Sequence, residues 1–280
     1  IEVSKDLNEN IIMNKSVYLR SCDFKDVLWE IEDDLSCVVF DSVVGAIVEG
    51  FAFKSNASSC IVFDNSSDCF VVDNLFFSNG YNAIRDYCDF DNLSSYKDVS
   101  FGNYILHNSF YGGDVSIDLV HCLNYSFIGN DFNEDNVSLM DHFNVSYNNF
   151  AHNVGILAHE SSNSLFERNC FYNMDVMGVC LLDGLNDSFI NNSFSQCNVS
   201  VDINGNYVSL RNNNFSNNNF GIVIEGVNNS VISNFIMNND FGVFSESSDD
   251  LCINFNRIVN NDEFGIYVVD GSVNATNNWW

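Results

Sequence analysis

The chain has 280 residues, of which 46% are hydrophobic and 14% aromatic, so it holds enough apolar material for a large core, which argues against wholesale disorder. Ten Lys and Arg against 38 Asp and Glu give a net charge of -28, which repels a phosphate backbone and argues against nucleic acid as a partner. Neutral glycans, calcium and basic protein surfaces remain compatible with this charge. No stretch reaches the roughly 18 to 20 apolar residues that a membrane span needs.

Before residue 74 the repeat weakens, but strand signals continue at similar spacing. The segments SVYLRSCDF, SVVGAIVEGFAF and CFVVDNLFF alternate apolar and polar residues and predict short strands. The opening, IEVSKDLNEN, is not typical of a signal peptide, and the chain starts with Ile. We expect irregular early coils over 1–70, and we expect this chain to be a fragment of a longer protein.

From residue 74 onward an asparagine recurs two places before a large apolar residue. The apolar residues follow one another at intervals of 34, 22, 18, 21, 23, 21, 21, 22 and 22 residues. The ten asparagines are Asn74, Asn108, Asn130, Asn148, Asn169, Asn192, Asn213, Asn234, Asn256 and Asn278. A period near 22 residues is the size of one turn of a parallel β-solenoid, and a β-propeller blade of about 40 residues fits poorly.

Each repeat contains a second strand that opens with Gly or Ser, as in FGIVIEG, FGVFSES and FGIYVVD. Strict alternation over four to six residues predicts strands, and no segment keeps a helical period for long. The chain contains no proline, as expected if nearly every backbone amide donates to a neighbouring coil.

Stacked coils explain this composition, because in-register strands about 4.8 Å apart place like residues on like. An asparagine at a repeated corner tolerates left-handed backbone angles, and its amide can donate to the next asparagine. The phenylalanine that follows builds an aromatic stack in the core. We therefore predict an all-β, right-handed parallel β-helix of roughly ten to twelve coils, about 22 residues per coil, with an internal Asn ladder.

The 34-residue interval holds about a dozen residues beyond one coil. They fall in RDYCDFDNLSSYKD, so we expect an insertion loop at about 85–98. With this loop, we predict a single parallel β-helix domain over 1–280.

The units NNSVISNFIMNNDFGVF, DLCINFNRIVNNDEFGIYVVDG and VNATNNWW resemble right-handed parallel β-helix repeats of the pectate-lyase-like superfamily. More narrowly, they resemble repeats of large adhesin-like surface proteins of methanogenic archaea. The resemblance implies a right-handed coil, export and an extracellular place at the cell surface. It does not decide activity, because the superfamily includes lyases, hydrolases, epimerases and non-catalytic adhesins.

The ten cysteines lack the close paired spacings of zinc or haem sites. Five disulfides could form in an exported protein. We expect most of the cysteines to be small buried hydrophobes instead.

Potential chemistry gathers in one outward column, four residues after the Gly or Ser of each second strand, with one residue of slip in places. The column runs through His121, His142, His159, Asp183, Asn204, Glu225, Glu246 and Asp270. The three histidines, with Asp118, Asp141 and Glu160 nearby, are candidates for a metal site or for general acid and base catalysis. Alternatively, this strand face is polar only because it meets water.

Two functions remain open. The first is a non-catalytic, adhesin-like solenoid at the cell surface that binds a polysaccharide, a cell-surface glycan or a surface protein of another cell. The second is a secreted polysaccharide lyase, epimerase or glycoside hydrolase, with calcium as a possible cofactor. LAHE, residues 157–160, resembles the Asp-Pro-His-Glu motif of alginate epimerases but lacks its Asp and Pro. A pectate-lyase site would need calcium carboxylates beside an Arg or Lys, and the sequence groups none.

Overall fold

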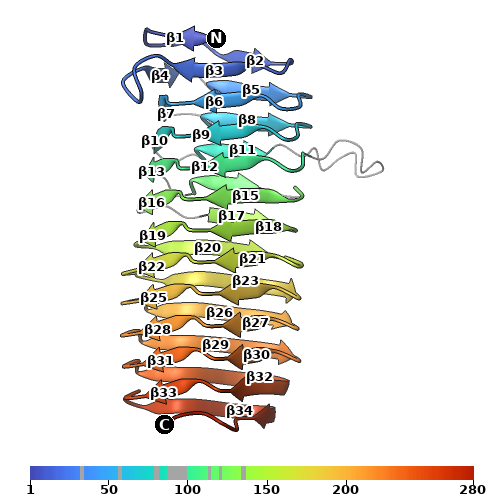
Figure 1. Cartoon of the computed structure of the whole chain (residues 1–280), viewed down its shortest axis with the longest axis vertical. Helices are drawn as coiled ribbons and strands as arrows, with labels where there is room; N and C mark the ends of the chain where they lie inside the picture. The colour runs from blue at the N-terminus through green and yellow to red at the C-terminus, as the bar shows by residue number, and fades with distance from the viewer. Residues whose placement is uncertain are drawn as a thin grey trace. The chain divides into compact units, whose positions relative to one another are not determined.

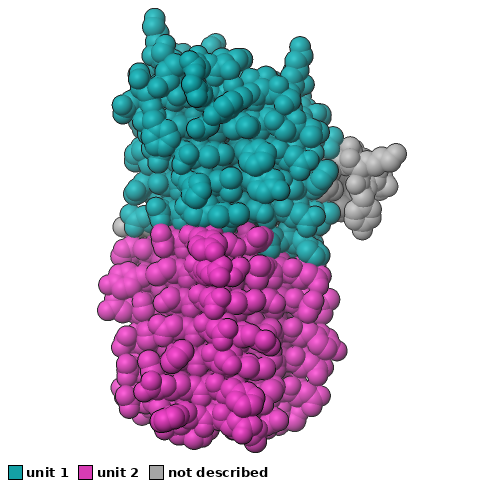
Figure 2. Space-filling view, in the orientation of Figure 1, with its two compact units in different colours: residues 1–143 teal, residues 144–280 magenta. Residues whose placement is uncertain are grey.

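The computed structural model describes residues 1–31, 35–55, 59–78, 82–86, 100–112, 115–119, 122–133 and 137–280. In this part of the chain all the regular elements are β-strands, and no helix occurs (Figure 1). The chain divides into two compact units, residues 1–143 (unit 1) and 144–280 (unit 2), shown in teal and magenta in Figure 2. The described residues therefore contain no helix that could span a membrane.

Each coil of unit 1 is built from three short strands. The first strands are β2 (Ile11–Met13), β5 (Val38–Asp41), β8 (Ile61–Asp64), β11 (Ile84–Asp86), β14 (Ile117–Leu119) and β17 (Val137–Met140). The second strands are β1 (Glu2–Val3), β3 (Tyr18–Ser21), β6 (Ile47–Glu49), β9 (Phe70–Val72), β12 (Tyr104–Leu106) and β15 (Tyr125–Ile128). The third strands are β4 (Leu28–Ile31), β7 (Ala52–Ser55), β10 (Leu75–Ser78), β13 (Ser109–Tyr111) and β16 (Asp131–Asn133). The unit boundary falls inside β18 (Phe143–Ser146).

Unit 2 repeats this arrangement with longer first strands, which correspond to the strands predicted above to open with Gly or Ser. These are β20 (Val154–His159), β23 (Met177–Leu185), β26 (Val199–Asn206), β29 (Phe220–Val227), β32 (Phe241–Asn254) and β34 (Phe264–Asn274). The second strands are β21 (Leu165–Glu167), β24 (Ser188–Ile190), β27 (Ser209–Arg211) and β30 (Ser230–Ile232), followed by the later part of β32. The third strands are β19 (Asn149–Ala151), β22 (Cys170–Tyr172), β25 (Ser193–Ser195), β28 (Asn214–Ser216), β31 (Phe235–Met237) and β33 (Arg257–Val259).

Strands pair in parallel with their counterparts one coil away. In the third strands of unit 2, for example, Phe171 is in register with Phe194, Phe194 with Phe215, and Phe215 with Ile236. The chain is an all-β parallel solenoid of about 11 turns with about 22 residues per coil, which confirms the predicted fold class.

The internal asparagine ladder is present within each unit. In unit 1 the side-chain amide of Asn108 donates to Oδ1 of Asn130 at 3.1 Å. In unit 2 the same bond runs unbroken through seven residues, at 3.0 to 3.1 Å. These are Asn148, Asn169, Asn192, Asn213, Asn234, Asn256 and Asn278. Each Oδ1 also accepts the backbone N–H of the preceding ladder residue, so the ladder satisfies buried corner groups.

The expectation that the ladder asparagines take left-handed backbone angles is wrong. The residue immediately before each of them takes the positive φ. These residues are Asp73, His107, Gly129, Tyr147, Arg168, Asn191, Asn212, Ser233, Phe255 and Asn277. The left-handed residue makes the bend, and the asparagine after it then points into the coil, where its amide meets the next rung.

A column of stacked rings follows the ladder. Phe150, Phe171 and Phe194 stack with centroids 4.7 and 4.6 Å apart and nearly parallel planes. In unit 1 the column reaches back past the first asparagine, because Phe76 stacks on Phe53 and Phe53 on Trp29. The early coils thus keep the aromatic position while Val27 and Phe51 replace the asparagine, so the Asn pattern does not detect them.

The predicted insertion loop lies mostly outside the described residues. Arg85 and Asp86 end strand β11, and residues 87–99 are not described. Nine cysteines are described, six of them buried, and no disulfide joins two of these nine.

Candidate functional site

The first strands of unit 2 turn two parallel columns of side chains outward. One column consists of Val154, Met177, Val199, Phe220, Phe241 and Phe264. The other consists of Leu157, Cys180, Asp202, Val223, Phe244 and Tyr267. Between the columns the strands place a Gly or Ser and then a fully buried Ile or Val, such as Gly221 and Ile222. Two consecutive inward positions bring the flanking residues to the same outer face, which we call the first-strand face.

Five aromatic residues meet on the last three coils of this face. Phe220 stacks on Phe241 at 4.7 Å, and Phe244 stacks on Tyr267 at 5.8 Å. The two columns also touch each other, since Phe220 meets Phe244 edge-on at 6.0 Å and Phe264 lies 4.9 Å from Tyr267. We call Phe220, Phe241, Phe244, Phe264 and Tyr267 the aromatic patch. Phe220, Phe241 and Phe244, whose coils have a neighbour on both sides, are each half-buried, so the patch keeps ring surface on its outer face.

A single carboxylate interrupts the apolar columns beside this patch. Asp202 is in register with Cys180 on one side and Val223 on the other, and it is half-buried between them. Burial raises the pKa of Asp202. Burial, together with the charge of Asp202, also raises the pKa of the Cys180 thiol. Asp202 makes no hydrogen bond or ion pair with any residue that the structure describes, so its oxygens remain available as acceptors.

The first-strand face carries no Lys or Arg, and its one histidine among the described residues, His159 at the end of β20, lies in the register column of Glu225. Unit 2 contains three arginines, and all lie on other parts of the coil. Arg168 occupies the corner before the Asn ladder, where its guanidinium donates to the hydroxyl of Tyr147 and lies 2.9 Å from Glu167. Arg211 ends β27 and Arg257 begins β33. The charge of this face is therefore set by carboxylates.

The predicted histidine column is distributed over different parts of the structure. His121 lies outside the described residues. His142 lies in unit 1, in the turn after β17, where its carbonyl accepts the N–H of Asn124. His159 lies in unit 2, at the end of β20, with Nδ1 3.9 Å from a carboxylate oxygen of Glu160.

The other candidates have ordinary neighbours. In unit 1, Asp118 in β14 accepts a hydrogen bond from the side-chain amide of Asn82 at 3.1 Å. Asp141 takes a positive φ of 73° in the turn before His142. In unit 2, His159 is in register with Leu182 rather than Asp183, which sits at a strand irregularity.

The described residues contain no preformed metal cluster. Over the described ranges, no group of three or more His, Cys, Asp and Glu side chains could hold a metal ion. A metal at His121, His142 and His159, and a role for calcium, therefore stay predictions.

Two buried carboxylates belong to the core rather than to a site. In unit 1, Asp86 accepts the hydroxyl of Tyr125 at 2.6 Å and that of Ser100 at 3.2 Å. Burial, followed by the charge of Asp86, raises the pKa of Tyr125 well above its ordinary value. In unit 2, Asp187 accepts hydrogen bonds from Ser161 and from the backbone of Ser164. Both carboxylates satisfy donors at buried corners and are closed to solvent.

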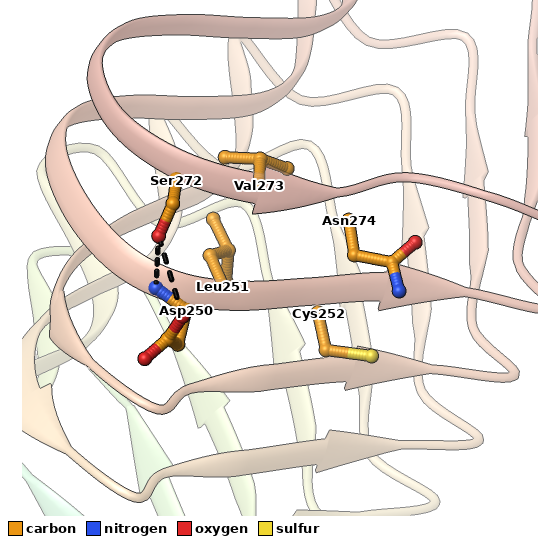
Figure 3. Close-up of a pocket in the computed structure, with 6 residues that line it drawn as sticks. All are labelled: Asp250, Leu251, Cys252, Ser272, Val273 and Asn274. Carbon is orange, nitrogen blue, oxygen red and sulfur yellow. Dashed lines mark hydrogen bonds between the residues drawn. The ribbon is translucent and has the colours of Figure 1, made fainter.

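A hollow of about 350 Å³ lies along the later parts of β32 and β34 (Figure 3). It is lined by Asp250, Leu251, Cys252, Ser272, Val273 and Asn274. The hydroxyl of Ser272 accepts the backbone N–H of Asp250 at 2.7 Å and lies 3.4 Å from its carboxylate (Figure 3). Asp250 is the one carboxylate in this lining, and its contact with Ser272 joins two coils, so the hollow offers no paired acid and base.

The coil architecture defines the class of this protein, a parallel β-solenoid whose outer face is open to solvent. The family described as right handed beta helix region matches residues 133–279, and the chain belongs to that family. No curated protein matches the sequence.

Several solved structures share the fold at low sequence identity. The periplasmic alginate epimerase AlgG aligns with a TM-score of 0.66 and 13% identity, over 94% of this chain and 76% of the epimerase. The catalytic domain of an alpha-1,3-glucanase in complex with tetrasaccharides aligns with a TM-score of 0.63 and 10% identity, over 100% of this chain and 64% of that domain. The A-module of an Azotobacter vinelandii mannuronan C-5 epimerase aligns with a TM-score of 0.53 and 11% identity, over 94% and 90% of the two chains. At these identities the likeness concerns the fold.

Proposed function

We propose that this protein is a non-catalytic, adhesin-like solenoid that acts outside the cell and binds a glycan on the first-strand face of unit 2. The observation that carries this proposal is the aromatic patch, in which five rings form one partly exposed surface. Neighbouring rings of the patch stack on one another, so the patch presents mainly apolar ring edges. A contiguous apolar surface of this kind can pack against the apolar C–H faces of sugar rings, and it marks an interaction site.

The fold comparisons support a carbohydrate ligand. Two of the similar structures are epimerases of alginate or mannuronan, and a third is a glucanase domain with bound tetrasaccharides. The extracellular, cell-surface location rests on the resemblance of the repeats to archaeal adhesin-like proteins. The similar structures include a periplasmic epimerase and a tailspike protein, which supports a place outside the cytoplasm.

Binding to a panel of polysaccharides tests this proposal. The double variant Phe241→Ala with Phe244→Ala removes the centre of the patch, and we expect it to abolish binding that the wild type shows. Phe235→Ala is the matched control, because Phe235 is 49% exposed but lies in β31, away from the first strands. Equal loss of binding in the control and the double variant would contradict the proposal, as would a wild type that binds no glycan.

The alternative function is a polysaccharide lyase or epimerase, and one observation favours it. Asp202 is a half-buried carboxylate with a raised pKa beside the patch, which is how enzymes prepare a general acid. The assay is depolymerisation or epimerisation of uronate polysaccharides with calcium present. Activity that disappears in Asp202→Asn, or in His142→Ala with His159→Ala, would place the enzyme ahead of the adhesin.

A further inference from the structure

The charge of the first-strand face bears on which glycans it can hold. Along this face Asp202 lies among apolar and aromatic side chains, and Glu225 follows one coil later near the end of β29. The arginines of unit 2 lie elsewhere on the coil. A polyuronate or a sulfated glycan would bring repeated negative charges to a surface that has these two carboxylates and no Lys or Arg, with His159, three coils before Glu225 in the same column, as its basic side chain.

Asp202 also offers a specific contact. Its carboxylate is half-buried, stands between Cys180 and Val223, and has no partner within the described chain. A carboxylate held in such a place gains most from ligand donors that replace the water it loses. Pairs of sugar hydroxyls supply such donors without bringing a charge.

We infer that the glycan bound by this protein is uncharged, with its rings packed on Phe241 and Phe244 and its hydroxyls donating to Asp202. This inference rests on the proposed glycan-binding function and narrows it to neutral polysaccharides. It separates this protein from the alginate-directed epimerases that share its fold, because alginate is a polyanion.

The test uses the whole chain and three sets of polysaccharides. The neutral set contains glucans, mannans and galactans, and the anionic set contains glucuronan, alginate and polygalacturonate. Chitosan is the cationic member. Affinities are measured by calorimetry at low and at high salt, for the wild type, Asp202→Asn, the double variant Phe241→Ala with Phe244→Ala, and the control Phe235→Ala.

We expect a neutral polysaccharide to bind with an affinity that salt leaves almost unchanged, because no charge pair is screened. Asp202→Asn should weaken this binding about tenfold, which is the ordinary cost of losing a charge-assisted hydrogen bond. The same variant should not lower the thermal midpoint of unfolding, since burial disfavours the Asp202 charge. A structural role for Asp202 would instead lower both affinity and stability.

Other outcomes separate this inference from the proposed function. Preferential binding of an anionic glycan, or tighter binding after Asp202→Asn, would overturn the inference while leaving glycan binding intact. Salt-sensitive binding of chitosan alone would overturn it in favour of a cationic ligand. Binding that the double variant loses and Asp202→Asn retains in full would remove Asp202 from the site. A wild type that binds none of the three sets would refute the proposed function itself.

Discussion

Replacing one rung of the asparagine ladder tests how unit 2 is held together. The Asn213 side chain makes four hydrogen bonds. Its Oδ1 accepts the backbone N–H of Asn192 at 2.8 Å and the Asn192 amide at 3.0 Å. Its Nδ2 donates to the carbonyl of Phe189 at 2.9 Å and to Oδ1 of Asn234 at 3.1 Å. Asn213 is fully buried, so Asn213→Ala leaves these partners without water to replace the lost bonds.

The expected loss follows from the groups that are orphaned. Asn234 keeps the backbone N–H of residue 213 as a donor, so the main cost falls on the N–H of Asn192 and the carbonyl of Phe189. A buried group without a partner costs about 1 to 3 kcal/mol, so two such groups give a loss of about 2 to 6 kcal/mol in the free energy of unfolding. Asn214→Ala is the matched control and should change stability by less than about 0.5 kcal/mol. Asn214 is only partly buried, and its amide reaches Ser216 at 3.5 Å.

Urea unfolding followed by circular dichroism measures the two free energies. Hydrogen exchange then adds a local readout. The backbone N–H of Asn192 loses its acceptor in Asn213→Ala, so it should exchange faster than in the wild type. If both variants unfold within about 1 kcal/mol of each other, and the Asn192 amide keeps its protection, the ladder does not stabilise the coil in the way described.

Two further changes probe backbone and burial. In Gly226→Ala, the new Cβ would lie 2.0 Å from the carbonyl oxygen of Gly205 at a φ of +110°, so we expect a loss of about 2 to 4 kcal/mol in urea unfolding, against a small change in the exposed control Val227→Ala. Burial raises the pKa of the Cys197 thiol from 9.0 to about 11. The folded state therefore favours the neutral thiol, and this contribution to stability is complete below pH 9 and is lost as the pH rises to 11. The stability of the wild type relative to Cys197→Ala should therefore fall by about 2 to 3 kcal/mol across that window, and a constant difference would contradict the assignment.

The residues of the aromatic patch recur regularly in the sequence, but the assumption of strict strand alternation assigns part of them to the core. Phe220, Phe241 and Phe264 each precede a glycine and recur at the period of the coil. Strict alternation from that glycine places the preceding Phe toward the core. In the structure the strand places two consecutive residues inward, the glycine and the residue after it, so the Phe comes out on the same face as Phe244. Alternation did place Asp202 outward, but the residues around it gave no sign of its unpaired carboxylate.

The histidine column shows where counting along the sequence fails to predict side-chain positions. Its members were matched by counting from a glycine or serine, and counting cannot see where a strand ends. His142 lies in a turn. In unit 2 the count without slip agrees with the structure, because Leu182, four residues after Gly178, is in register with His159 and Asn204, whereas the slip to Asp183 does not agree. Outward positions near strand ends depend on corner geometry, which varies from coil to coil.

The coil, its period, the asparagine ladder and the stack of rings behind it can be read from the repeat alone, because parallel in-register strands place identical side chains one above another. A repeat in the chain therefore becomes a column in space without further information. Three features needed the folded coil: which residue at each corner takes the left-handed bend, where Trp29 and Phe53 continue the stack without asparagine, and which outward columns touch. Contacts between columns depend on how each strand bends at its glycine, and that bend is fixed by packing against neighbouring coils rather than by local residue preference.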